Sequence, residues 1–109
     1  MRTLYQEQIE FTKKVARLID YVFSQGYGCT LGDAYRDPRV HGGYGEKRGY
    51  GAADSFHKKR LAIDLNLFKD GHFLSSSKDH EPIGVWWEKQ GGTWGGRFRD
   101  GNHYSWGEK

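Results

Sequence analysis

Two short segments of this chain, residues 55–65 and 100–106, contain the residue types from which a catalytic metal site is built. The first holds His57 and Asp64, and the second holds His103. Two imidazoles and one carboxylate are a ligand set of catalytic zinc, in which three protein ligands leave the fourth tetrahedral position open for water. We therefore predict a metal hydrolase with these three side chains as its ligands.

The sequence around Asp64 predicts a half-buried strand. Apolar and polar residues alternate, imperfectly, over residues 61–68, and this alternation places Asp64 on the polar face. His57 lies just before the strand, where a basic turn allows the chain to bend toward that face. A second strand-like run at residues 103–106 would complete the ligand set with His103 if it lies beside the first strand.

Asp100 is a further carboxylate that lies shortly before His103. From there it can approach the same metal at another angle without binding it. A carboxylate in that position can remove a proton from the water that attacks a carbonyl and pass it to the leaving amine. We assign Asp100 the role of general base; the alternative is that Asp100 and Gly101 form only a turn.

Taken together, the pattern S-x-H-x6-D followed by D-x-x-H-x-x-W resembles the M15 family of zinc peptidases. This family contains D,D-carboxypeptidases, D-Ala-D-Ala dipeptidases and phage L-alanyl-D-glutamate endopeptidases, and the chain looks most similar to the phage enzymes over about residues 27–106. The resemblance implies one zinc ion per chain, held by His57, Asp64 and His103, and a catalytic Asp100.

The resemblance extends to residues that would assist the ligands. It implies that Arg36 helps polarise the scissile carbonyl, where a cation would stabilise the developing oxyanion. Without the resemblance, Arg36 reads equally well as a surface charge at a turn. Ser55, which begins the first motif, is expected to support the site by hydrogen bonding without binding the metal. Trp106, which ends the second motif, is expected to pack in the core like the other tryptophans, and from its place next to the site it could also support the site.

Three further histidines, His41, His72 and His80, have no acidic or histidine partner at a spacing that a strand could use. We interpret them as surface or hydrogen-bonded residues. Cys29, the one cysteine of the chain, has no second cysteine for an intramolecular disulfide and reads as a small buried hydrophobic residue.

The remaining patterns predict an α+β domain in which a small, mostly antiparallel sheet is packed by two or three helices and carries the zinc site on one face. A glycine-rich segment with few aliphatic residues is expected to border the substrate groove. The predicted elements are a helix at 3–24 ended by Gly26, a strand at 27–31, the glycine-rich loop at 37–54, a hairpin turn at 70–71, a helix at 82–90 and a glycine-rich bend at 93–99.

Length and composition set the remaining expectations. The chain has 109 residues, so we expect one catalytic domain over 1–109, with no separate wall-binding module. We expect this domain to be monomeric and to gain stability from its metal. A net charge of +3 suits an anionic partner such as a cell wall. The patterns indicate neither a signal peptide nor a membrane span, so we expect synthesis in the host cytoplasm followed by release to the wall.

These observations favour a zinc peptidase of the peptidoglycan stem peptide, a phage endolysin that cuts between L-Ala and D-Glu. The near alternative is a D-Ala-D-Ala carboxypeptidase, which would need a cationic pocket for a free carboxylate. A basic nucleic-acid-binding module would explain the charge and the aromatic residues, but the basic residues are scattered and the His and Asp pattern would be unexplained, so no nucleic acid is expected. A third reading is an inactive wall-binding domain stabilised by metal.

Overall fold

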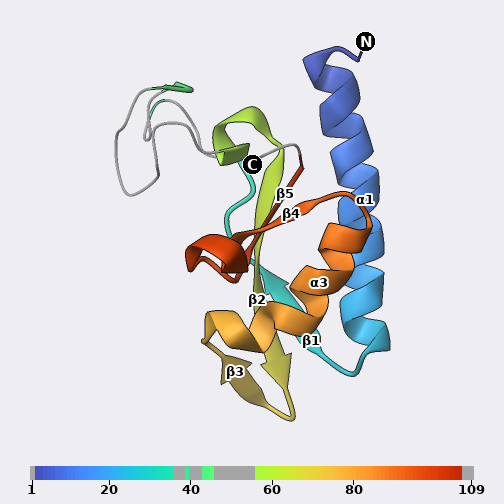
Figure 1. Ribbon diagram of the computed structural model, residues 1–109, viewed down its shortest axis with the longest axis vertical. Helices are drawn as coiled ribbons and strands as arrows, with labels where there is room; N and C mark the ends of the chain where they lie inside the picture. Colours follow the sequence, from blue (N-terminus) through green and yellow to red (C-terminus); the bar gives the residue numbers. More distant parts are fainter. Residues whose placement is uncertain (1, 36–38, 40–42, 46–55, 107–109) are drawn as a thin grey trace.

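A five-stranded antiparallel sheet lies at the centre of the structure, a computed structural model that describes residues 2–35, 39, 43–45 and 56–106 (Figure 1). The strands run in the order β1-β2-β5-β4, with β3 also paired to β2. The elements are α1 (Leu4–Ser24), β1 (Gly28–Leu31), η1 (Phe56–Lys59), β2 (Ala62–Lys69), β3 (His72–Leu74), η2 (Ser77–His80), α3 (Glu81–Lys89), β4 (Thr93–Trp94), η3 (Gly95–Phe98) and β5 (His103–Ser105), where η marks a 3-10 helix.

Helix α1 is stabilised by the residues at both of its ends. The Thr3 hydroxyl accepts a hydrogen bond from the Gln6 backbone N–H, and the Thr3 N–H donates to the Gln6 side chain at 2.9 Å, so two N–H groups at the helix start are satisfied. Gly26 follows the helix with a φ of +85°, a conformation that favours glycine. The buried side chains of this helix fall on one face: Phe11, Leu18 and Val22.

Strand β2 is the longest strand and pairs with three others. On one edge it pairs with β1, and on the other edge it pairs first with β5 and then with β3. Asp70 and Gly71 form the turn into β3 with φ values of +52° and +79°, which is the turn geometry that two-residue hairpins prefer. On the edge that β5 and β3 share, Asn66 lies between the two pairings.

Both α-helices of the described chain contribute to one hydrophobic core against the sheet (Figure 1). Alternate residues of β2 face this core, so the intervening residues, Asp64 among them, project from the opposite face. Trp87 of α3 is fully buried and donates a hydrogen bond to the Ser105 carbonyl of β5 at 3.0 Å. The core therefore fixes β5, the strand that carries His103.

The predicted α+β class with its small antiparallel sheet is confirmed, and one segment differs. Residues 93–99, expected as an irregular bend, contain β4, which pairs with β5, and the 3-10 helix η3. Trp94 gives this segment a regular structure, because its ring is buried and its indole N–H donates to the Gly101 carbonyl at 2.7 Å.

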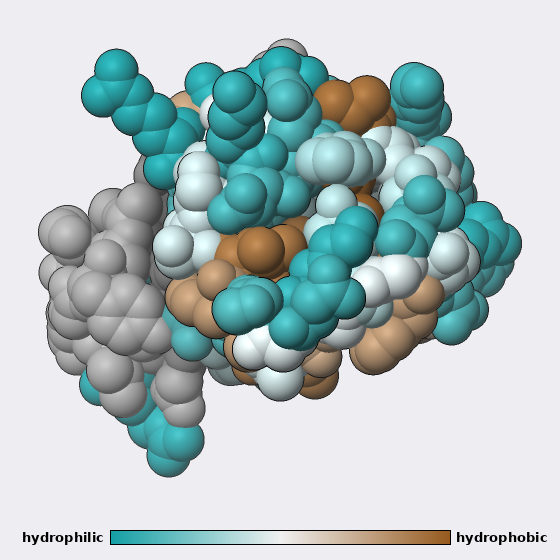
Figure 2. Space-filling view, turned by 90° about the horizontal axis from the view of Figure 1, so that it is seen from below, coloured by the Kyte–Doolittle hydropathy of each residue, from teal (hydrophilic) through white to brown (hydrophobic). Residues whose placement is uncertain are grey.

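The surface seen from below is mainly hydrophilic, with small separate hydrophobic areas (Figure 2). Within the described residues, no helix is both long enough and apolar enough to cross a lipid bilayer. The expected groove-bordering loop at 37–54 lies largely outside the described residues.

Replacing Gly84 with alanine is expected to destabilise the domain. A Cβ at Gly84 would collide with the ring of the buried Trp94, so α3 would have to move away from β4. We expect a loss of about 1–3 kcal/mol in the free energy of unfolding, measured by urea denaturation. Gly28→Ala is the matched control, since a Cβ there meets nothing within 4 Å. Equal stability of the two variants would contradict this packing.

Candidate metal centre

Three side-chain atoms converge on one point at the sheet face opposite the core. His57 Nε2 lies 3.1 Å from Asp64 Oδ1 and 3.2 Å from His103 Nδ1, and His103 Nδ1 lies 3.5 Å from Asp64 Oδ1. The two imidazoles are buried, at 1% and 4% exposure, while the Asp64 side chain keeps 16% of its surface. The structure thus brings together the three ligands predicted from the sequence.

Strand register produces this convergence. Asp64 of β2 and His103 of β5 are directly paired across the antiparallel ladder, so their side chains project from the same face. His57 reaches the same place from η1, a single turn that leads through Arg60, with a φ of +60°, into β2. The basic segment before the strand therefore bends as expected.

The orientation of His57 is set by a backbone carbonyl. His57 Nδ1 lies 3.0 Å from the Ala34 oxygen, which can only accept, so Nδ1 carries a proton and Nε2 is the ring nitrogen that would bind a cation beside Asp64 and His103. Ala34 is itself held beside β2, because the Asp64 N–H donates to the Asp33 carbonyl at 2.8 Å. A backbone oxygen has no residue-type signature, and sequence reasoning did not find this contact.

Asp64 is held in its ionised form. Burial alone would raise the pKa of this carboxyl, but hydrogen bonds from His103 and His57 and the positive charge on those rings outweigh burial and lower the pKa to about 2. A carboxylate that stays charged near neutral pH is the form that binds a cation.

The donor set fits a tetrahedral zinc ion. With zinc–ligand distances of about 2.0–2.2 Å, the ligand atoms of a tetrahedral site lie about 3.3–3.6 Å apart. The three separations between His57 Nε2, Asp64 Oδ1 and His103 Nδ1 are 3.1, 3.2 and 3.5 Å, close to this range. Nitrogen and carboxylate ligands also match the chemistry of zinc, and three of them leave one position for water.

Asp100 lies at the rim of this group. Its Oδ2 is 3.8 Å from His103 Nδ1, and the side chain is 53% exposed, so the carboxylate faces solvent beside the candidate ligands. Two close contacts position it. The Asp100 N–H donates to the Gly95 carbonyl at 2.8 Å, and a Cβ at Gly95 would collide with the Asp100 carbonyl. Arg99, just before it, has a left-handed φ of +64° that turns the chain into the loop.

The other predicted site residues are placed differently. Arg36 and Ser55 lie outside the described residues, so their roles stay predictions. Trp106 is not brought to the group of candidate ligands: its ring packs edge-on against Trp87, with centroids 5.8 Å apart, and Lys14 lies over its face.

The remaining histidines are distributed as the sequence indicated, as far as the structure describes them. His72 is exposed on β3, and His41 lies outside the described residues. His80 is 3% exposed and hydrogen-bonded, with its Nδ1 2.8 Å from the Tyr104 hydroxyl. None of the three joins the group that could hold a metal in the described part of the chain.

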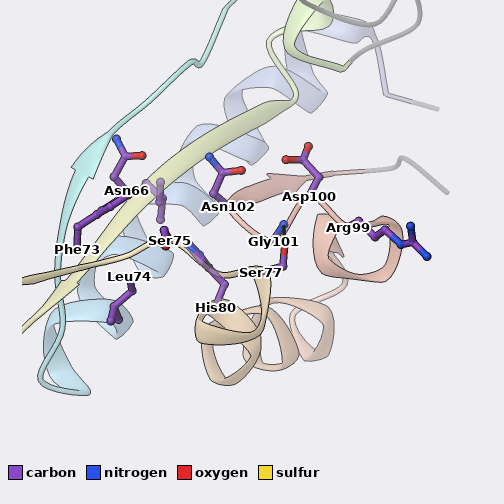
Figure 3. A pocket seen from close by; sticks show the side chains of 11 residues that line it. Asn66, Phe73, Leu74, Ser75, Ser77, His80, Arg99, Asp100, Gly101 and Asn102 are labelled. Carbon is purple, nitrogen blue, oxygen red and sulfur yellow. Dashed lines mark hydrogen bonds between the residues drawn. The ribbon is translucent and has the colours of Figure 1, made fainter.

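A polar pocket of about 260 Å³ adjoins Asp100 (Figure 3). Its walls come from the loop before β5, from the edge of β2 and from η2. In Figure 3 Asp100 and Asn102 point in one direction from the loop, whereas the Arg99 guanidinium points away from the pocket. Such a pocket beside a carboxylate and a candidate metal site can receive part of a substrate.

Two histidines and an aspartate that meet on a rigid sheet, beside an exposed carboxylate, form the arrangement of a metal-dependent hydrolase. A family model of the M15 peptidases, described as D-alanyl-D-alanine carboxypeptidase, matches residues 48–106, more than half of the 109-residue chain. The chain belongs to this peptidase family and is a metallopeptidase. Membership supports an enzyme that acts on peptidoglycan, of the D-alanyl-D-alanine carboxypeptidase kind. A comparison with curated proteins found no match.

Removal of one candidate ligand is expected to remove the metal. His57→Ala deletes a donor atom that lies within 4.8 Å of the other two, so we expect zinc content to fall from one per chain to near zero and zinc-induced thermal stabilisation to disappear. Elemental analysis and thermal unfolding with and without zinc measure both effects. The exposed His72→Ala is the control and should bind zinc normally. Stoichiometric zinc in His57→Ala would contradict the ligand set.

Stability of the metal-free protein is expected to fall in mild acid because of His80. Burial lowers the pKa of this imidazole from 6.5 to about 4, although Asp79 acts in the opposite direction. The folded protein therefore keeps His80 neutral while the unfolded chain takes up a proton, so stability is full above pH 6.5 and declines as the pH falls toward 4.

The full effect corresponds to about 3 kcal/mol. Urea unfolding at neutral pH and at about pH 4, with chelator present, measures this loss as a difference in the free energy of unfolding. The amide of His80→Asn does not titrate, so in this variant the free-energy difference between the two conditions should be smaller by that amount. An unchanged difference in the variant would show that His80 does not carry it.

Proposed function

We propose that this protein is a zinc-dependent peptidoglycan endopeptidase that hydrolyses the bond between L-Ala and D-Glu of the stem peptide. The observation that supports it most directly is the convergence of His57, Asp64 and His103 within a segment that matches the M15 family. A bound zinc ion would act there as a Lewis acid that lowers the pKa of water and polarises the scissile carbonyl.

Asp100 performs the proton transfers in this proposal. Its side chain is exposed and stands 3.8 Å from His103, so it can reach both the attacking water and the leaving amine. It removes the proton as water adds to the carbonyl and then gives it to the amine when the C–N bond breaks. Arg36 is proposed to stabilise the oxyanion.

His57 and His103 are held in fixed positions during these steps. His57 is held through its Nδ1 by the Ala34 carbonyl, and His103 is held by the pairing of β5 with β2. Because both rings are buried in the sheet face, little reorganisation is needed when charge develops. Asp64, which stays ionised, offsets the positive charge of the site.

The lining of the polar pocket supports an endopeptidase over a carboxypeptidase. A free terminal carboxylate needs a cationic side chain to bind it. Among the described residues that line the pocket, Arg99 is the one lysine or arginine. Its guanidinium points outward in Figure 3, whereas the Asp100 carboxylate borders the pocket and would repel an anion. A D-Ala-D-Ala carboxypeptidase remains the second candidate, favoured by the description of the matching family.

The products of digestion distinguish these two activities. Purified peptidoglycan is incubated with the zinc-loaded protein, with the chelated protein and with the chelated protein after zinc is returned. New D-Glu amino termini that depend on zinc are the expected result. Release of free D-Ala would identify the carboxypeptidase instead, and no release of either from an intact zinc-loaded protein would overturn the proposed function.

Asp100→Ala is expected to keep its zinc and lose its activity. The side chain is not one of the three converging donors, so metal content should stay at one per chain, while loss of the base should lower kcat by at least about 100-fold. The control is Asp20→Ala, an exposed carboxylate on α1 whose removal should leave kcat unchanged. Near-normal turnover in Asp100→Ala would remove Asp100 from the proton-transfer role.

A further inference from the structure

The polar pocket occupies a gap in the sheet. β5 pairs with β2 as far as Asp64, and β3 pairs with β2 from Leu67 onward on the same edge, so Asn66 borders a stretch that neither strand covers. Helix η2 closes this gap from below with Ser77 and His80 (Figure 3). Asp64 and Asn66 are alternate residues on one face of β2, and Asp100 both lines the pocket and lies 3.8 Å from His103, so the pocket lies next to the candidate metal centre.

His80 forms part of the floor of this pocket and has one nitrogen to offer. Its Nδ1 is 2.8 Å from the Tyr104 hydroxyl, and Tyr104 is fully buried, with no other hydrogen bond to its hydroxyl in the described part of the chain. If Nδ1 donated this hydrogen bond, the hydroxyl proton would be left without an acceptor inside the core. The hydroxyl therefore donates to Nδ1, and the neutral ring carries its proton on Nε2.

The Nε2–H group of His80 faces the pocket. The residue is 3% exposed and lines the cavity, and Nε2 has no hydrogen-bond partner among the described residues. The one fully enclosed polar side-chain atom without a partner in those residues is the Ser105 hydroxyl, so Nε2, which has no partner either, is not fully enclosed and keeps some exposed surface in a residue that lines the cavity. Burial also lowers the pKa of His80, which keeps the ring uncharged near neutral pH.

We propose that this pocket is the subsite for the peptide on one side of the scissile bond, and that His80 is a specificity-determining residue whose Nε2–H donates a hydrogen bond to a backbone carbonyl oxygen of that peptide. The inference rests on the proposed peptidase function. Two charged residues, Arg99 and Asp100, also line the pocket. The other polar lining residues are uncharged: Asn66, Ser75, Ser77 and Asn102. Amides and hydroxyls around a neutral donor suit a peptide group better than a carboxylate.

Two substitutions separate this role from a structural one. His80→Asn keeps an acceptor near the position of Nδ1 for the Tyr104 hydroxyl but has no group that reaches the pocket, whereas His80→Gln carries an amide donor near the position of Nε2. We expect His80→Asn to raise the KM for purified stem peptide by about threefold to tenfold, with kcat and zinc content much less affected. His80→Gln should recover most of the wild-type KM.

A second readout does not depend on turnover. Nitrogen-15 spectra of the imidazole groups report which nitrogen of His80 carries the proton, and we expect Nε2–H in the free protein and a shift of that signal when stem peptide is added to Asp100→Ala. Equal KM values for wild type and His80→Asn, or an Nε2 signal that peptide does not move, would overturn the inference. If the wild-type protein cleaves no peptidoglycan, the proposed function fails, and the titration still decides whether peptide meets His80.

Discussion

The register between β2 and β5 is the constraint on which the rest of this site depends. Asp64 and His103 are cross-strand partners, so a shift of one residue would turn one of them toward the core and separate the carboxylate from the imidazole. The third donor, on His57, is held by a turn and a backbone carbonyl rather than by the ladder. Two ligands held by the strand pairing and one held by a turn thus meet at a single point.

The hydrophobic core protects that register from the opposite side of the sheet. Ile63 and Leu65 flank Asp64 in β2, and Tyr104 follows His103 in β5; all three are buried among the core side chains. Any slip between the strands would expose these apolar groups as well as break the site. Trp94 and Gly101 then tie the loop that carries Asp100 to the same core. The catalytic face is polar, but the free energy that shapes it comes from the apolar face.

Much of this arrangement could be predicted from local patterns. Helical spacing and the closing Gly26 marked α1, alternation marked β2, and the Asp70-Gly71 pair marked its hairpin, because each signal acts over a few neighbouring residues. The three candidate ligands were also recognised, since their residue types and spacings are unusual together.

The parts that escaped prediction depend on atoms or contacts without a local signature. The Ala34 carbonyl that orients His57 is a backbone group, and the hydrogen bond of His80 to Tyr104 joins residues that are distant in sequence. The two-residue strand β4 is too short for any periodicity to reveal, and its neighbouring glycines suggested a bend. For Trp106 the sequence allowed a core position, a place beside the site or both, and its ring packs against Trp87, because successive residues of an extended chain point to opposite faces.

The contact between His57 and His103 also joins two positions 46 residues apart in the chain. A cation bound to both would act as a removable cross-link that closes a long loop, which restricts the unfolded chain in the manner of a disulfide. The same ion would then take part in catalysis and also stabilise the folded chain. An enzyme of this design is expected to resist proteolysis best in its metal-loaded form, so that the supply of metal controls the lifetime of the protein together with its chemistry.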